Sequence, residues 1–189
     1  MWSGRKQTQP ETVTPQVTVK PEIALFPKGT PIHIERVPSG LATATAQSCN
    51  GCHFAIHDDW SQSAHATAGR SKAFTDAVHR AANSTACTQC HQPLVAQHAN
   101  LATGYIDGDL ARPILQPNPA FDATFLAEGV GCAACHVREG LIVSTRDAPN
   151  APHPVVKSSE LASSAFCANC HQLSFPESDQ PFYNTYGEW

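Results

Sequence analysis

The sequence predicts a mainly α-helical protein with extensive coil, in which short helices follow an extended N-terminal arm. Two observations predict this class. Fifteen prolines and eleven glycines divide the 189 residues into short pieces, and no long amphipathic run appears among them. Eight cysteines fall into four C-x-x-C pairs, each followed directly by a histidine, at spacings too unequal for a strict repeat.

Residues 1–40 form the predicted extended arm. Proline and the residue before it favour extended backbone, so we expect coil here with a short strand from Ile32 to Val37. We also expect the second half of the arm, which carries Phe26 and His33, to pack against the rest of the protein. The prolines of the arm are Pro10, Pro15, Pro21, Pro27, Pro31 and Pro38.

The four C-x-x-C-H motifs are the strongest chemical signal in the sequence. Disulfides, two four-thiolate zinc sites or redox dithiols would each explain the cysteines. None of these needs a histidine after the second cysteine, and with 10 histidines in 189 residues four such coincidences have odds of about 1 in 100,000. The motif cysteines are Cys49, Cys52, Cys87, Cys90, Cys132, Cys135, Cys167 and Cys170, and the motif histidines are His53, His91, His136 and His171.

Covalent attachment of c-type haem requires this spacing. The two thiols add to the two vinyl groups of one porphyrin, and the adjacent histidine lies under the iron as its proximal ligand. We therefore expect four haem c groups. Their macrocycles would supply apolar surface that a small domain otherwise lacks. Residues 41–189 are thus expected to form one small tetrahaem cytochrome c domain, with short helices wrapped around a closely packed haem array.

The chemistry of attachment also predicts a compartment. Haem is joined to this motif outside the cytoplasm, so we expect a periplasmic or extracellular protein. The first residues, MWSGRKQTQPETVTPQ, contain no apolar stretch of signal-peptide length. We therefore expect a targeting or anchoring segment to be absent from this sequence, and membrane association to occur only through such a segment. The net charge of −4 gives no indication of nucleic-acid binding.

The sixth iron ligands must come from histidine. Met1 is the only methionine, so each iron is either bis-histidine or open. If the segment after His53 is helical, His57 lies one turn away on the same side of the haem, and His65 lies roughly 18 Å along the helix. Both must then serve a different haem, as must His98, two helical turns after His91. His153 stands between two prolines, in a loop suited to the haem of the third or fourth motif.

Two segments resemble multihaem c-type cytochromes typified by the tetrahaem cytochrome of ammonia oxidisers. They are CNGCHFAIHDDWSQSAHA, with Trp60 and Ser63 in W-x-x-S-x-H-A, and EGVGCAACH, from Glu128 to His136. The resemblance spans roughly residues 45–175. It implies that His65 ligates the third haem, His98 the first and His153 the fourth. We expect the Trp60 ring to pack against haem and its N–H to find a partner.

The second haem, at Cys87, Cys90 and His91, has no assigned sixth ligand. In the ammonia-oxidiser type this iron is open, whereas here three histidines are spare: His33, His57 and His79. His33 could even reach a neighbouring subunit, as happens in resembling filament-forming cytochromes. The final segment PFYNTYGEW either leads into further motifs of a longer multihaem chain or serves as a packing tail.

These ligands favour electron transfer over catalysis. Bis-histidine haems relay single electrons with little ligand rearrangement, between redox partner proteins or along neighbouring copies of the same chain. The alternative is an enzyme whose open second haem acts on a small nitrogen compound or peroxide. Near the second motif, however, the polar side chains are only Thr88, Gln89 and Gln92. We therefore expect an electron carrier rather than an enzyme.

Overall fold

The computed structural model describes residues 32–80, 85–109, 112–174 and 181–189. In this part of the chain, short helices alternate with three small sheets. The helices are α1 (Ala46–Asn50), α2 (Phe54–Ser61), α3 (Ala64–Thr67), α4 (Lys72–Arg80), α5 (Thr85–His91), α6 (Ala123–Leu126), α7 (Cys132–His136), α8 (Ser164–His171) and α9 (Thr185–Glu188), with 3₁₀ turns η1 (Val95–Gln97), η2 (Ile106–Gly108) and η3 (Glu160–Ala162). The strands are β1 (Asn100–Tyr105), β2 (Pro113–Pro117), β3 (Val137–Arg138), β4 (Leu141–Ser144), β5 (Val155–Lys157), β6 (Leu173–Ser174) and β7 (Pro181–Tyr183).

Side-chain caps start several of the short helices. An oxygen of Thr45, Ser63, Asp122 or Ser163 accepts a hydrogen bond from a backbone N–H in the first turn of α1, α3, α6 or α8 respectively. Such a cap satisfies donors that a helix start leaves without intrahelical partners. Short capped helices are what the sequence predicts around the motifs.

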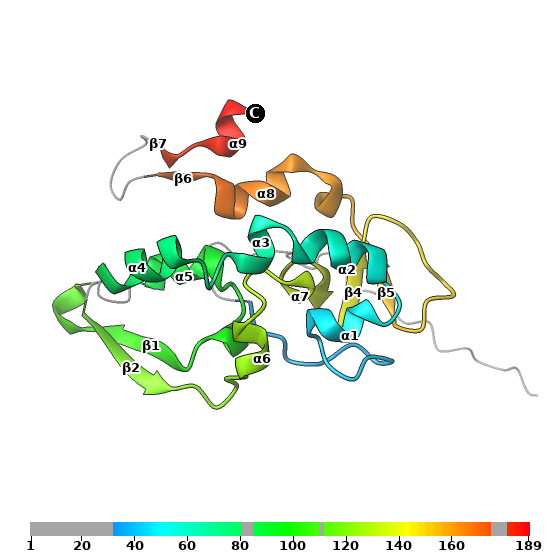
Figure 1. Ribbon diagram of the computed structural model, residues 1–189, viewed down its shortest axis with the longest axis horizontal. Coiled ribbons are helices and arrows are strands. Elements are labelled where there is room, and N and C mark those ends of the chain that lie inside the picture. Colours follow the sequence, from blue (N-terminus) through cyan, green and yellow to red (C-terminus); the bar gives the residue numbers. More distant parts are fainter. Residues whose placement is uncertain (1–31, 81–84, 110–111, 175–180) are drawn as a thin grey trace, which may run out of the picture.

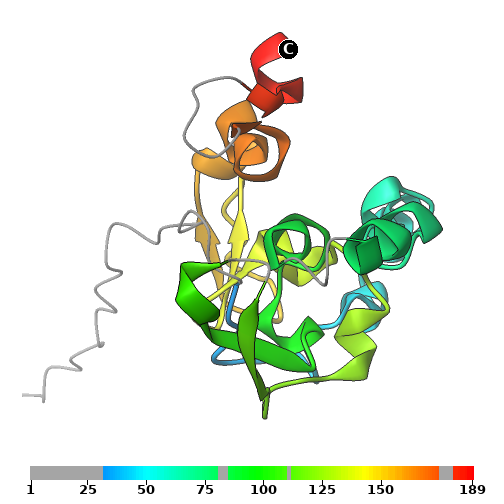
Figure 2. The same cartoon turned by 90° about the vertical axis from the view of Figure 1, so that its left-hand side faces the viewer.

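The elements lie in tiers. In Figure 1 the C-terminal elements α8, β6, β7 and α9 lie above α2 and α3, and the β1–β2 hairpin lies below α4 and α5. Figure 2, turned about the vertical axis, keeps α8 at the top and the hairpin at the bottom, with α5 and α7 between them. The motif helices α1, α5, α7 and α8 are therefore distributed through the molecule. Among the described helices, none has the length and apolar character needed to span a bilayer.

A three-stranded sheet follows the third motif directly. β3 pairs with β4 in antiparallel fashion, and β4 pairs with β5 in parallel. β5 begins two residues after His153, and the N–H of Ile142 donates to the carbonyl of Pro154 at 2.9 Å. The sheet thus links the third motif to the loop that carries His153. These small sheets make the described part mixed in secondary structure, which the proline-rich sequence did not predict.

In the described part of the chain, the hydrophobic core is small and consists of alanine and branched aliphatic side chains. Its buried cluster is Ile32, Ala44, Leu94, Ala133, Ala134 and Val137. Large apolar residues close to a motif stay uncovered by protein: Phe54 and Ile56, directly after His53, are 73% and 67% exposed. The protein alone therefore leaves unburied apolar side chains next to the first motif.

The arm packs on the body where it is described, but the expected strand is wrong. Ile32 is 6% exposed, and its backbone exchanges hydrogen bonds with Pro93 and Val95. This is a single bridge to Leu94, and residues 33–37 are not a strand, because the 3₁₀ turn η1 ends the partner segment. Residues 1–31, including Phe26, lie outside the described part.

Candidate functional site

Three of the C-x-x-C-H motifs are carried by short helices: the second and fourth end α5 and α8, and the third forms α7. The first motif begins at the end of α1, crosses a turn at Gly51 and Cys52, and reaches His53 at the N-cap position of α2. One helical turn separates the two cysteines of such a motif, which brings them to one side of the helix. This is the arrangement in which two thiols can reach one ligand.

Three motif histidines are oriented through Nδ1. The Nδ1 atom of His91 lies 3.0 Å from the carbonyl of Ala68, and that of His136 lies 2.8 Å from the carbonyl of Val143. The hydroxyl of Tyr183 lies 3.5 Å from Nδ1 of His171. In each ring the hydrogen bond leaves Nε2 available, as in metal-binding histidines whose second nitrogen bonds a carbonyl.

Two motif histidines face a second histidine. The ring centroids of His53 and His153 are 6.4 Å apart, and those of His65 and His171 are 6.1 Å apart. Burial, and secondarily the charge of His171, lowers the pKa of His65 and favours its neutral, ligating form. The Nδ1 atom of His153 is buried without a hydrogen-bond partner. The resemblance assigned His65 to the third motif and His153 to the fourth, whereas the structure brings them to the fourth and the first.

The helical geometry used for His65 and His98 does not hold. α2 ends at Ser61 and α3 begins only at Ala64, so the chain bends between His53 and His65. His98 follows the η1 turn instead of continuing α5. Its Nε2 lies 2.8 Å from the carbonyl of Gln92, which leaves Nδ1 as the nitrogen free for a ligand, and burial lowers its pKa.

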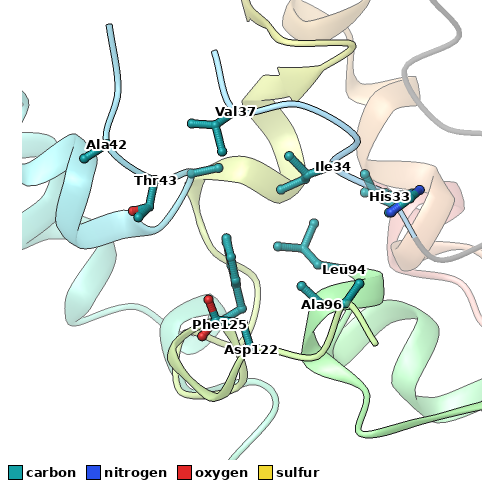
Figure 3. Close-up of a pocket in the computed structure, with 12 residues that line it drawn as sticks. His33, Ile34, Val37, Ala42, Thr43, Leu94, Ala96, Asp122 and Phe125 are labelled. Carbon is teal, nitrogen blue, oxygen red and sulfur yellow. The ribbon is translucent and has the colours of Figure 1, made fainter. Parts of the chain in front are cut away.

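The three spare histidines have different surroundings. His57 is half-buried with its ring 5.4 Å from that of Trp60, and His79 is exposed at the end of α4. His33 is exposed at the edge of a cavity of about 220 Å³. Figure 3 shows Ile34 and Leu94 at this cavity and the His33 ring pointing away from them. No ring contact with a motif histidine is described for any of the three, so the structure does not indicate which of them would supply a sixth ligand to a haem at the second motif.

The two segments that carry the resemblance interlock. The Nε1–H of Trp60 donates to the carbonyl of Val130 at 2.9 Å, and the N–H of Val130 donates to the carbonyl of His65 at 2.9 Å. The expected partner for the Trp60 N–H is confirmed. A Cβ on Gly129, whose φ is +60°, would lie 2.6 Å from the His65 carbonyl oxygen, so only glycine fits there. W-x-x-S-x-H-A and E-G-V-G-C thus hold His65 in position together.

The cysteines of different motifs touch. The thiols of Cys49 and Cys132 share a hydrogen bond that lowers the pKa of Cys49 to about 7 and raises that of Cys132. Cys90 and Cys170 form the same kind of pair, with the pKa of Cys90 lowered to about 7. Cys135 lies close enough to Cys167 for their charges to interact. These contacts connect the motifs in the order first, third, fourth, second.

The second motif has an apolar neighbour that the sequence did not reveal. The ring of Phe74, from α4, stacks on that of His91 with centroids 4.5 Å apart and planes 12° apart. The amide Nε2 of Gln92 donates to the carbonyl of Gly69 at 3.0 Å. One of the nearby polar side chains is therefore engaged in holding the turn after α3. The helix pattern of α4 gave no reason to connect Phe74 with a histidine seventeen positions away in another helix.

Glu128 is a further group that sequence reasoning missed. Its Oε1 accepts a hydrogen bond from the N–H of Ala46 at 2.7 Å, and its Oε2 is buried without a hydrogen-bond partner. Burial raises its pKa to about 7, against the opposing effect of the Ala46 hydrogen bond. In the sequence, the signal that could have identified Glu128 was its position four residues before Cys132.

Comparisons with protein-family models, with curated proteins and with solved structures give no match for the chain. Within the part that the structure describes, no three His, Cys, Asp or Glu side chains gather as a bare metal-ion site.

Proposed function

We propose that this chain is a tetrahaem c-type cytochrome that transfers single electrons between extracytoplasmic redox partners or along neighbouring copies of itself. The observation that carries the proposal is the pairing of histidine rings across two of the four C-x-x-C-H motifs. The motifs supply thiols and proximal ligands for covalent haem, and the second histidines supply sixth ligands.

The ring separations fit haem iron. Two imidazoles on opposite sides of one metal have centroids roughly 6 Å apart, since each metal–nitrogen bond is about 2 Å and each centroid lies about 1 Å behind its nitrogen. The separations of 6.4 Å for His53 and His153 and 6.1 Å for His65 and His171 match this value. Iron would also give the buried Nδ1 of His153 the partner that it lacks among protein atoms.

The uncovered apolar side chains support the same group. Phe54 and Ile56 stand exposed on α2 directly after the first motif, and Leu173 is exposed two residues after the fourth. Large apolar side chains left bare beside a ligand site favour an apolar ligand. A porphyrin face would cover them and would extend the small core of alanine and branched residues.

We therefore assign the axial ligands differently from the resemblance. His53 and His153 would hold the first haem, and His171 and His65 the fourth. His136 and His91 would be the proximal ligands of the third and second haems. His98 would ligate an iron through Nδ1, because its Nε2 is hydrogen-bonded to the Gln92 carbonyl.

The order of motif contacts favours a relay. Contacts between Cys49 and Cys132, and between Cys90 and Cys170, would place the haems of the first and third motifs, and those of the second and fourth, next to each other. The proximity of Cys135 to Cys167 would join the two pairs. Electrons would then move through the haems in the order first, third, fourth, second, or the reverse.

The haems would supply the one-electron chemistry, and the protein would set its conditions. The Ala68 and Val143 carbonyls hold the rings of His91 and His136 in one tautomer, which favours strong ligation. Histidine on both sides of an iron gives a lower potential than histidine with methionine. Since the same ligands hold ferric and ferrous iron, little rearrangement accompanies each transfer.

The alternative, an open second haem acting as an enzyme, lacks an observation in its favour. Phe74 stacks on the proximal ring, and Gln92 is engaged with Gly69. A catalytic iron would need an acid or base beside it, and the side chains described around His91 supply none.

A redox titration followed by absorbance tests the proposed function. We expect a broad curve, mainly below the standard hydrogen electrode, because bis-histidine ligation lowers the potentials and neighbouring haems repel each other's charge. Carbon monoxide should bind at most one reduced haem in four. A narrow transition at high potential, or carbon monoxide bound at several haems, would contradict an electron carrier with bis-histidine haems.

A further inference from the structure

We propose that Glu128 takes up a proton from solvent when an electron enters the first or third haem, so that the chain carries protons together with electrons. This inference rests on the proposed function, because it needs haem at both motifs. It concerns a buried carboxyl that electron transfer itself does not use.

Glu128 stands between two motif helices. Its Oε1 accepts a hydrogen bond from the N–H of Ala46, the first residue of α1, and this helix carries Cys49. Its Oε2 lies where a Cβ on Gly131 would be only 2.7 Å away, at the start of α7, which begins with Cys132. The charge of Glu128 acts on both thiols, Cys49 and Cys132. The carboxyl therefore lies beside both haem attachment points.

The surroundings of Glu128 make its two protonation states close in free energy. An ionised carboxylate with one buried, unpartnered oxygen is costly, which favours the neutral form. The hydrogen bond from Ala46 favours the ionised form. The pKa of about 7 expresses this balance, so a small change in nearby charge decides whether the proton is bound.

Other charges around Glu128 would not titrate in the same range. From α1 and α7 it faces Cys49 and Cys132, which become uncharged thioethers on haem attachment. From the start of α6 it faces Asp122, whose pKa is lowered by hydrogen bonds from Thr124. The segment from His65 to Ala68 packs on Gly129 through backbone atoms. Asp122 thus stays ionised near neutral pH and only raises the pKa of Glu128.

The coupled step balances in charge and atoms. A one-electron reductant converts ferric iron to ferrous iron, and the haem loses one positive charge. Without that charge the Glu128 carboxylate is less stable, and it binds one proton from water to become the carboxylic acid. On reoxidation the electron leaves to an acceptor and the proton returns to solvent.

The test is a spectroelectrochemical titration of the haem-loaded protein over a pH series from acid to alkaline. Two of the four components should fall in potential as pH rises through neutrality, by at most about 59 mV per pH unit, since a tenfold change in proton concentration corresponds to that potential for one electron. Glu128→Gln should make both components independent of pH in this range. Glu139→Gln removes an exposed carboxyl close to the third motif and should leave the dependence intact.

Infrared spectroscopy of the wild-type protein gives a second readout that needs no variant. Reduction should produce a protonated-carboxyl band that shifts when glutamate is labelled with carbon-13. In protein with four haems attached, the inference would be overturned by potentials that do not change with pH, or by a pH dependence that persists in Glu128→Gln. A chain without haem would overturn the proposed function itself, so the two failures are distinct.

Discussion

Replacing His65 with alanine is expected to convert one haem in four from low-spin to high-spin and to leave all four attached. The ring of His65 lies 6.1 Å from that of His171, at the separation expected across an iron, so its loss should open the sixth position of the fourth haem. The reduced variant should then bind carbon monoxide at this haem. Electron paramagnetic resonance of the ferric protein measures the high-spin fraction directly.

A matched control and a second variant locate the affected haem. His57→Ala removes a histidine ring from the same segment as His65. This ring contacts Trp60 instead of a motif histidine, so its loss should leave the spectrum unchanged. In a protein that also lacks the fourth haem, through Cys167→Ala and Cys170→Ala, His65→Ala should add no high-spin signal. If it does add one, His65 serves another haem, as the resemblance implies for the third. His153→Ala should behave in the same way with respect to the first haem, through its contact with His53.

Removing the third haem should have the largest effect on both structure and electron flow. With Cys132→Ala and Cys135→Ala the chain should carry three haems. Its free energy of unfolding should fall by several kcal/mol, because the macrocycle's buried apolar surface is lost. The first haem should also exchange electrons with the fourth far more slowly, because the third lies between them in the order of motif contacts.

The second motif provides the control for that order. Cys87→Ala with Cys90→Ala also removes one haem, but from the end of the proposed relay. Electron exchange between the first and fourth haems, measured after rapid photoreduction, should then stay close to the wild-type rate. Equal slowing in the two double variants would contradict the order first, third, fourth, second.

The sequence predicted the parts of the site that local chemistry determines. C-x-x-C-H predicts which atoms would attach and ligate each haem, and this stays a prediction. Proline and glycine frequency predicts short elements, as found in α1, α5, α7 and α8. It also predicted that Trp60 would need a partner for its N–H, which Val130 provides. Each of these follows from residue types and spacings within a few positions.

The pairing of histidines could not be predicted in the same way. It depends on bends at Gln62 and Ser63, and on the sheet that brings His153 back from beyond the third motif. Close packing adds to this: Gly40, at a φ of +89°, lies against the carbonyl of Pro152, next to His153. Contacts between residues a hundred positions apart, such as His53 with His153, are set by such tertiary features. The prediction assumed that helices continue beyond His53 and His91, and it therefore did not include these contacts.

The measurement that tests the account most directly is a joint count of haems and thiols in the purified protein, produced with the machinery for covalent haem attachment. The absorbance of its pyridine complex, set against protein concentration, should give four haems per chain. After denaturation and reduction no cysteine should react with a thiol reagent, because all eight are thioethers. Eight reactive thiols and no covalent haem would contradict the account. That result would be expected of a zinc protein, or of a protein with disulfides such as one between Cys49 and Cys132.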